Sequence, residues 1–261
     1  MFQITPIVRN LLIANLVIFF LAGTLHLNEM FSLYNVFSDH FRPYQFVTYM
    51  FLHADFNHIF RNMLTLFFFG PMLEMFWGAK RFMIFFMVCG LGAGATYAAI
   101  NVYETSSFRA DMSAYKEAPH SDKFAAFIHK HVPEFEQSLL EFENVYAQNE
   151  TQPAYITQSV DIIDKIYEAK VQNATMLGAS GAVFGILMAF GMLFPNTEMM
   201  LLFIPFPIKA KYLVGAYGLY EVYSTLKPSP GDNVAHVAHL GGMLFAFIMI
   251  MMWKKDRNNF Y

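Results

Sequence analysis

The sequence contains only one cysteine, Cys89, which lies inside an apolar run. A single thiol excludes a disulfide framework and a cysteine-based metal site, so we interpret Cys89 as a packing residue. Charged residues are also scarce, at 14% against about 25% in an ordinary soluble domain. The net charge of -3 gives no basic surface, and we therefore expect no nucleic-acid partner. The first apolar run lacks a small-residue cleavage site, which argues against a cleaved signal peptide.

Apolar residues are abundant, at 56% with 30 Phe and 18 Met, whereas about 45–50% is usual for a soluble domain. This excess indicates a membrane protein, in which a spanning helix needs roughly 20 mostly apolar residues. The stretch LLFIPFPIKAK contains two prolines, so we interpret it as an interfacial loop. Six apolar runs predict spanning helices, the fifth being short: Val8–Leu25, Phe56–Phe76, Phe82–Val102, Met176–Phe194, Tyr212–Leu226 and Val234–Trp253.

Lys and Arg residues in the short loops indicate the orientation, because positive residues concentrate in cytoplasmic loops. With both termini in the cytoplasm, eight of these residues lie inside and two, Arg42 and Lys227, lie outside. We therefore expect a multi-pass protein of the lipid bilayer, and the compact six-span layout favours a bacterial inner membrane. The eight inner residues are Arg9, Lys80, Arg81, Lys209, Lys211, Lys254, Lys255 and Arg257.

The segment Tyr103–Gln172 interrupts the apolar pattern. It contains 12 Asp or Glu and 6 Lys or Arg, and parts of it have the apolar spacing of helices. We predict a mostly helical subdomain inserted on the extracytoplasmic side, where its acidic charge is compatible. The predicted organisation is an all-α membrane protein whose six-helix bundle has two parts, 1–102 and 173–261, on either side of this insertion.

Polar side chains occur near the start of three of the predicted spans. Such groups are costly in a bilayer, so each indicates a functional site by default. His58 and Asn62 are four residues apart on the second span, and His236 and His239 are three apart on the sixth. Ser180 is expected in the second turn of the fourth span, and His239 in the second turn of the sixth. Because these three spans run in the same direction, the polar groups are expected at one depth, roughly 5–10 Å below the outer helix ends.

Small residues explain how these polar groups meet. Gly181 and Gly185 form a small-xxx-small pair in the fourth span, and Gly242 and Ala246 form another in the sixth. Such pairs let helices approach closely in lipid. A close approach brings the fourth and sixth spans, and their polar residues, within hydrogen-bond reach of each other.

This set of side chains suits nucleophilic catalysis. A serine hydroxyl needs a neighbouring base to become a good nucleophile, and His239 is the candidate base for Ser180. His58, Asn62 and free amides at the start of the fourth span are candidate donors for a developing oxyanion. A shallow position makes a wet cavity that opens to the outside plausible.

Three short patterns occur in order on the second, fourth and sixth runs. They are His58–Asn62 (HIFRN), Gly178–Gly181 (GASG) and Ala238–Gly242 (AHLGG). Together they resemble the His-x-x-x-Asn, Gly-x-Ser-Gly and Ala-His-x-x-Gly patterns of rhomboid intramembrane serine proteases. The stretches FRPYQFVTYMFLHADFNHIFRNM and FGPMLEMFWGAKRF resemble the family's first loop and second span. The resemblance covers nearly the whole chain except Tyr103–Gln172.

The resemblance implies a Ser–His dyad without a required acid, with Ser180 as nucleophile and His239 as general base. It implies an oxyanion hole of His58, Asn62 and the backbone amides of Ala179 and Ser180. It also implies transmembrane protein substrates, cut in or near their membrane segment, and no metal or cofactor. The supporting positions are Phe184, expected to pack on the catalytic histidine, and three glycines, Gly178, Gly181 and Gly242.

Several of these polar residues also have structural interpretations. His236 is expected to satisfy a backbone carbonyl, and His53 either lines the cavity or lies at the interface. The pair of His236 and His239 is half a zinc site, without a third ligand in metalloprotease spacing. Arg61 and Glu74 are expected to pair, reach the interface or pin loops rather than act chemically.

Two other function classes are open at this point. One is a non-catalytic rhomboid relative that binds and escorts membrane proteins, although such relatives usually lack the serine or the histidine. The other is a transporter or channel, which is disfavoured because the polar residues cluster near one face and no inverted repeat is visible.

Overall fold

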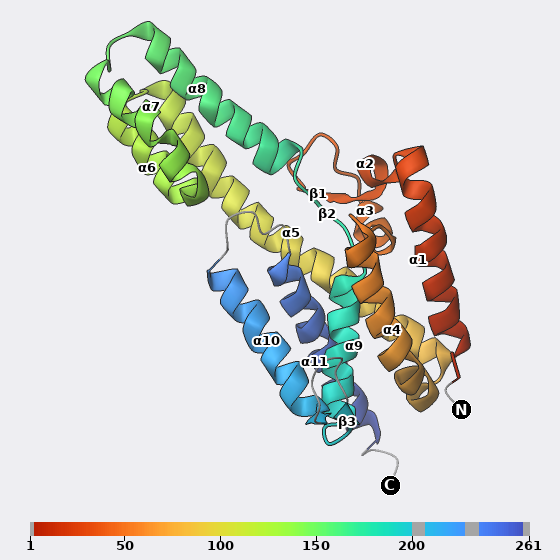
Figure 1. Cartoon of the computed structure of the whole chain (residues 1–261). Coiled ribbons are helices and arrows are strands. Elements are labelled where there is room, and N and C mark those ends of the chain that lie inside the picture. Colours follow the sequence, from red (N-terminus) through yellow and green to blue (C-terminus); the bar gives the residue numbers. More distant parts are fainter. Residues whose placement is uncertain (1–2, 200–206, 228–234, 258–261) are drawn as a thin grey trace. The chain divides into compact units, whose positions relative to one another are not determined.

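The computed structural model describes residues 3–199, 207–227 and 235–257, and these residues are mostly helical (Figure 1). The proline-rich stretch predicted as an interfacial loop lies largely outside them. Within these described ranges, four short strands form two pairs, β1 (Leu33–Tyr34) with β2 (Thr175–Met176) and β3 (Glu198–Met199) antiparallel to β4 (Ile208–Lys209). The helices are α1 (Pro6–Leu25), α2 (Leu27–Phe31), α3 (Gln45–Thr48), α4 (Phe56–Trp77), α5 (Ala79–Glu117), α6 (Ser121–His131), α7 (Glu136–Gln148), α8 (Pro153–Tyr167), α9 (Ser180–Leu193), α10 (Ala210–Leu226) and α11 (His236–Arg257), with short 3-10 or π turns at η1 (Tyr49–Phe51), η2 (Pro133–Phe135) and η3 (Glu168–Gln172).

The chain forms two compact units. The first comprises Met1–Leu33, Arg42–Ala98 and Thr175–Tyr261, and the second comprises Tyr34–Phe41 and Ala99–Ala174. The boundary after Ala98 falls inside α5, so this helix contributes to both units.

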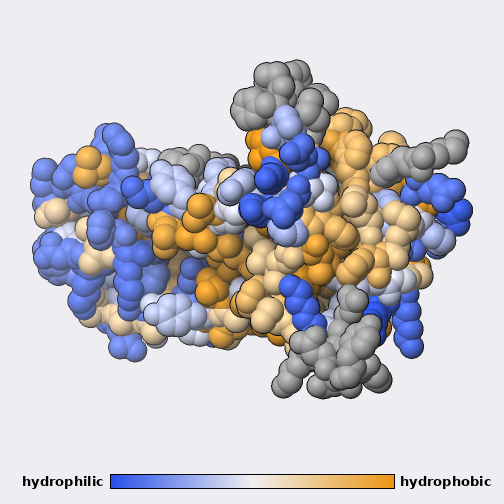
Figure 2. All heavy atoms as spheres, turned by 90° about the horizontal axis from the view of Figure 1, so that it is seen from below, coloured by the Kyte–Doolittle hydropathy of each residue, from blue (hydrophilic) through white to orange (hydrophobic). Residues whose placement is uncertain are grey.

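Among the residues that the structure describes, three helices are long and apolar enough to cross a membrane, within Pro6–Leu25, Ala79–Glu117 and His236–Lys254. The chain is an integral membrane protein. Helix α9 is also apolar but has only 14 residues. Helices α4 and α10, which were also predicted as spans, do not meet the combined requirements of length and hydropathy for a spanning helix. Large apolar side chains are strongly exposed on α1, α10 and α11, with Phe20 at 74%, Leu219 at 73% and Met252 at 63%. Figure 2 shows broad areas of hydrophobic residues on the surface, and large exposed apolar areas of this kind mark membrane or protein interaction surfaces.

The start of α9 differs from the prediction. The fourth run was expected to be helical from Met176, but α9 begins at Ser180 and has 14 residues. The cause is Gly178, whose φ of +129° is outside the helical region and is tolerated by glycine. Ser180 is therefore the first residue of the helix rather than part of its second turn. Likewise, α11 begins at His236, so His239 lies in the first turn.

The third predicted span also differs, because α5 does not end near Val102 but continues to Glu117. Beyond the apolar run the helix keeps an apolar stripe, Phe108, Met112 and Tyr115, which packs into the core of the second unit. Pro119 follows shortly after the last helical residue and is typical of a helix stop.

Helix α9 is the centre of the first unit, where it contacts α4, α10 and α11 (Figure 1). Glycines make these contacts close, as the small-xxx-small pattern predicts. A Cβ on Gly242 would lie 1.9 Å from the carbonyl oxygen of Gly181, and a Cβ on Gly181 would lie 2.3 Å from Ala93 Cβ of α5. Gly185 faces the buried Cys89, which confirms that the thiol is a packing residue.

Glu74 of α4 binds the beginning of α1, a structural role rather than a chemical one. Its carboxylate accepts hydrogen bonds from the backbone N–H groups of Ile7 (3.0 Å) and Val8 (2.9 Å) and from the hydroxyl of Thr5. These are amides that a helix start leaves without acceptors, and a negative charge is favourable there. The burial of this carboxylate, 3% exposed, is thereby compensated.

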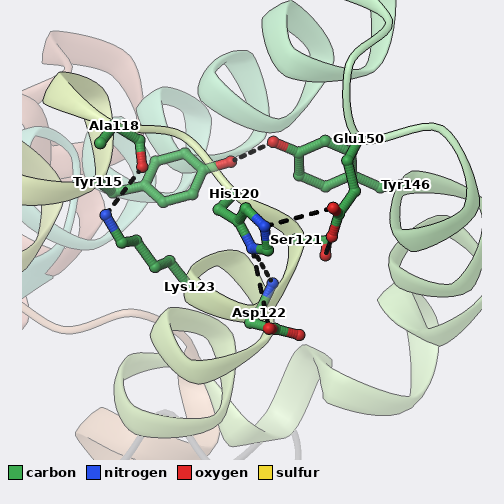
Figure 3. Close-up of polar contacts among 8 residues, drawn as sticks. All are labelled: Tyr115, Ala118, His120, Ser121, Asp122, Lys123, Tyr146 and Glu150. Atoms are coloured by element: carbon green, nitrogen blue, oxygen red, sulfur yellow. Dashed lines mark hydrogen bonds and ion pairs between the residues drawn. The ribbon is translucent and has the colours of Figure 1, made fainter.

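The second unit is a small helical core with its own polar contacts. Phe124 of α6 is fully buried and lies against the rings of Tyr115, Phe142 and Tyr146 at 5.3–6.2 Å. The hydroxyl of Tyr115 lies 3.5 Å from that of Tyr146 (Figure 3). The start of α6 is capped by His120, whose ring accepts from the Asp122 amide and lies 3.3 Å from the Glu150 carboxylate.

Replacing Phe124 with alanine is expected to cost about 3–5 kcal/mol of local stability, because it leaves a cavity among three aromatic rings. Limited proteolysis of the intact membrane protein should then cut within 99–174 much faster than in the wild type. The matched control is Leu140→Ala on α7, a 51% exposed side chain whose loss should change the rate little. Equal resistance of Phe124→Ala and wild type would contradict this packing.

Candidate active site

Ser180 and His239 are brought together from segments far apart in the sequence. The Nε2 atom of His239 lies 2.8 Å from the Oγ atom of Ser180, a hydrogen-bonding distance. Ser180 is positioned at the first residue of α9 by the turn at Gly178, whose N–H donates to the carbonyl of Tyr49 at 2.9 Å. The close glycine contact between α9 and α11 holds the two residues in register. The imidazole is 7% exposed.

Phe184 packs against the imidazole, one helical turn after the serine. The rings of Phe184 and His239 are 4.2 Å apart and inclined by only 9°, so they are stacked. This is the contact that the family resemblance implied. It fixes the plane of the imidazole and thereby directs one ring nitrogen at Ser180.

His58 faces the same point from α4. Asp55 caps α4 by accepting the His58 N–H at 2.9 Å, which places His58 in the first turn. A Cβ built on Gly178 would lie 2.7 Å from His58 Nε2 and 3.7 Å from Ser180 Oγ. The missing side chain of Gly178 therefore leaves a space that both the histidine ring and the serine hydroxyl border.

Asn62 lies one turn further along α4 and is 5% exposed. Its side-chain amide nitrogen is buried and has no acceptor among the residues that the structure describes. A buried donor without a partner costs free energy and is explained where an acceptor arrives with a ligand. The amides of Ala179 and Ser180 lie at the beginning of α9, where helix N–H groups lack intrahelical acceptors.

His53 is fully buried directly before α4, at 1% exposure, and does not lie at the protein surface. Its ring packs edge-on against that of His58, with centroids 5.0 Å apart. Burial lowers the pKa of His53 to about 3, and the neighbouring His58 acts in the same direction. His53 is therefore a neutral packing partner of His58 at physiological pH.

The structure adds a residue that the sequence analysis did not identify, Glu221 of α10. Its Oε2 atom lies 2.6 Å from Nδ1 of His236 and 3.0 Å from Nδ1 of His239. The first contact is a hydrogen bond. The second has the right length, but the ring N–H direction does not meet hydrogen-bond geometry. His236 thus pairs through Nδ1 with a carboxylate, a partner that the sequence analysis did not name.

These three residues are also the set whose ligand atoms, all within 4.8 Å of one another, could hold a metal ion in the described part of the chain. The sequence analysis did not identify this third candidate ligand, because Glu221 lies on another helix and is distant in sequence from the two histidines. In a tetrahedral zinc site, bonds of about 2.0–2.2 Å place neighbouring ligand atoms about 3.3 Å apart. The observed separations of 2.6 and 3.0 Å are shorter, so a proton fits between these atoms better than a metal ion does.

A protein-family model described as the rhomboid domain matches residues 40–112 and 145–255, which is more than half of the chain. The chain belongs to the rhomboid family. The match extends into both ends of the insertion predicted at 103–172, leaving 113–144 outside the rhomboid domain. Rhomboids are a family of intramembrane serine proteases and form helical membrane bundles, in agreement with the long apolar helices of this chain. A search of curated proteins gives no match to the chain.

Proposed function

We propose that this rhomboid is an intramembrane serine endopeptidase that cleaves transmembrane proteins in or near their membrane segment. The observation that carries the proposal is the 2.8 Å contact between His239 Nε2 and Ser180 Oγ inside a rhomboid domain. Ser180 serves as nucleophile and His239 as general base. Stacking by Phe184 keeps the base in place.

The proposed reaction has two steps. Ser180 Oγ attacks the scissile carbonyl carbon while its proton passes to His239 Nε2, and the C–N bond then breaks as this proton passes to the leaving amine. Water next attacks the acyl carbon, giving a proton to Nε2, and the serine regains that proton when the new carboxyl end leaves. The steps use neither a metal nor a cofactor.

The oxyanion that forms in each step requires hydrogen-bond donors. We assign this role to His58, the Asn62 amide and the backbone N–H groups of Ala179 and Ser180. The buried, unpartnered Nδ2 of Asn62 supports the assignment, as does the space that Gly178 leaves between His58 and Ser180. The positive end of the α9 dipole favours the same charge.

The membrane arrangement completes the proposal. Six helices, α1, α4, α5, α9, α10 and α11, form the bundle, with both termini in the cytoplasm and the helical insertion outside. Ser180 and His239 each lie in the first turn of a helix. Given the proposed orientation, with both termini in the cytoplasm, these helix ends and the site face the extracytoplasmic side. Water reaches the site from that side, and substrates reach it from the lipid.

Cleavage in proteoliposomes tests the proposal. We expect the purified protein to cut single-span substrate proteins and to generate new termini that mass spectrometry maps to the membrane segment or its immediate flank. Co-purification of intact substrates without new termini would instead indicate a non-catalytic binding protein. Solute flux without cleavage would indicate a transporter.

A further inference from the structure

Glu221 is a buried carboxylate that the proposed dyad does not use. It lies on α10 with 3% exposure, and the residues before and after it in the helix, Tyr220 and Val222, are aromatic and apolar. Removing a carboxylate from water is expensive unless partners compensate it. Glu221 has two such partners, because its Oε2 atom faces the Nδ1 atoms of His236 and His239. The position therefore indicates a role for the charge.

The two ring nitrogens of His239 face different groups. Nε2 faces Ser180 Oγ at 2.8 Å, and Nδ1 faces Glu221 Oε2 at 3.0 Å. A neutral imidazole carries one proton, and Nε2 accepts the serine proton only when that proton is on Nδ1. A carboxylate accepts but does not donate, so Glu221 favours this tautomer. It also stabilises the imidazolium that forms when Ser180 attacks.

His236 orients the carboxylate. It is 8% exposed, one turn before His239 on α11, and its Nδ1 hydrogen bond of 2.6 Å is the shorter of the two contacts of Oε2. This bond holds Oε2 of Glu221 beside Nδ1 of His239. The contact between Oε2 and the His239 Nδ1 atom has hydrogen-bond length but imperfect alignment. Catalytic hydrogen bonds are often poorly aligned without substrate and tighten as charge develops.

From these contacts we propose that Glu221 is a positioning residue, which acts through His239 and extends the dyad to a Ser180–His239–Glu221 triad. The inference rests on the proposed protease function and differs from the acid-free dyad that the family resemblance implied. Glu221 stays ionised throughout the reaction. No additional proton is transferred, so the balance of the two steps is unchanged.

The test compares kcat, KM and pH–rate profiles of wild type, Glu221→Gln and Glu221→Asp. Removing the acid of a soluble triad costs about 10⁴-fold in kcat. Because the contact here is imperfectly aligned, we expect Glu221→Gln to lower kcat by about 10²-fold with little change in KM. Glu221→Asp keeps the charge at a greater distance and should restore part of the rate.

The pH profile separates this role from a merely structural one. Among the described residues, the titratable groups facing His239 are Glu221 of α10, His236 of α11 and His58 of α4. With a neutral amide at 221 the protonated form of the His239 imidazole is less favoured. The fall of kcat/KM on the acidic side of the pH–rate profile (the acidic limb) should therefore move to lower pH. Loss of stability without this movement would indicate only a helix-pinning role and would overturn the inference.

The control is Glu74→Gln, which neutralises another carboxylate that is 3% exposed in the same unit. The Glu74 carboxylate hydrogen-bonds the beginning of α1 and makes no contact with His239 that the structure describes. Its kcat per correctly folded molecule and its acidic limb should match the wild type, even where its thermal stability falls. Active-site titration with a serine-directed probe counts the folded molecules in each sample. EDTA should leave the wild-type rate unchanged.

The outcomes distinguish the two proposals. A wild type that does not cleave contradicts the protease function itself. An active wild type with unchanged kcat and acidic limb in Glu221→Gln contradicts only the role of Glu221. Loss of wild-type activity in EDTA would mean that the cluster binds a metal ion, and this too would overturn the triad.

Discussion

Replacing Ser180 with alanine is expected to abolish detectable substrate cleavage. Loss of the nucleophile in a soluble serine protease lowers kcat by roughly 10⁶-fold, and the residual acceleration by the oxyanion donors and by substrate binding is small beside this loss. The substitution removes one hydroxyl at the start of α9 and adds no atoms, so the fold should persist. The measurement is the initial rate of fragment formation in proteoliposomes.

The control is Ser224→Ala on α10, at a serine that is 7% exposed and therefore more deeply buried than the half-buried Ser180. It should retain wild-type kcat, which shows that removing a buried hydroxyl from this bundle is not harmful in itself. Ser180→Ala with more than a few percent of the wild-type rate would remove Ser180 from the role of nucleophile.

Replacing Gly242 with alanine is expected to destabilise the bundle strongly. A Cβ at this position would lie 1.9 Å from the carbonyl oxygen of Gly181, which is backbone and cannot rotate away. Overpacking of a well-packed core costs typically about 1–3 kcal/mol, and a backbone clash belongs at or above the top of this range. To relieve this clash, α9 and α11 would have to move apart, and Ser180 would then move away from His239. Both the thermal midpoint in detergent and kcat should fall.

Gly215→Ala on α10 is the control, because no described atom lies within 4 Å of the added Cβ. Alanine favours a helix over glycine by roughly 1 kcal/mol, so this variant should be as stable as the wild type or slightly more stable. An equally stable Gly242→Ala would contradict the close contact of α9 and α11.

The sequence predicted the meeting of α9 and α11 because the relevant signals are local. Small residues spaced at one helical turn mark a face, and a polar side chain on that face must meet another in lipid. Ser180 and His239 lie on such faces, and their 2.8 Å contact follows from two independent patterns in the chain. Phe184 was expected from the family resemblance alone, and the structure places it on the imidazole.

Glu221 was not predicted, because its contacts depend on how α10 rotates against α11. The sequence did contain a signal, an ionisable residue inside a predicted span, and that rule would have identified it. The start of α9 was missed for a different reason. Its apolar run is continuous from Met176, whereas the boundary is set by the positive φ of Gly178, a backbone property that hydropathy does not reveal. Helix α5 extends beyond its apolar run because its later residues, such as Phe108 and Tyr115, pack into the hydrophobic core of the second unit.

Intact-mass analysis after reaction with a serine-directed fluorophosphonate tests the central claim most directly, since it depends on no natural substrate. The account predicts one adduct per wild-type chain, mapped to Ser180, and no adduct in His239→Ala, because the hydroxyl is reactive only beside its base. Absence of an adduct from folded wild type, or equal labelling of His239→Ala, would contradict the account.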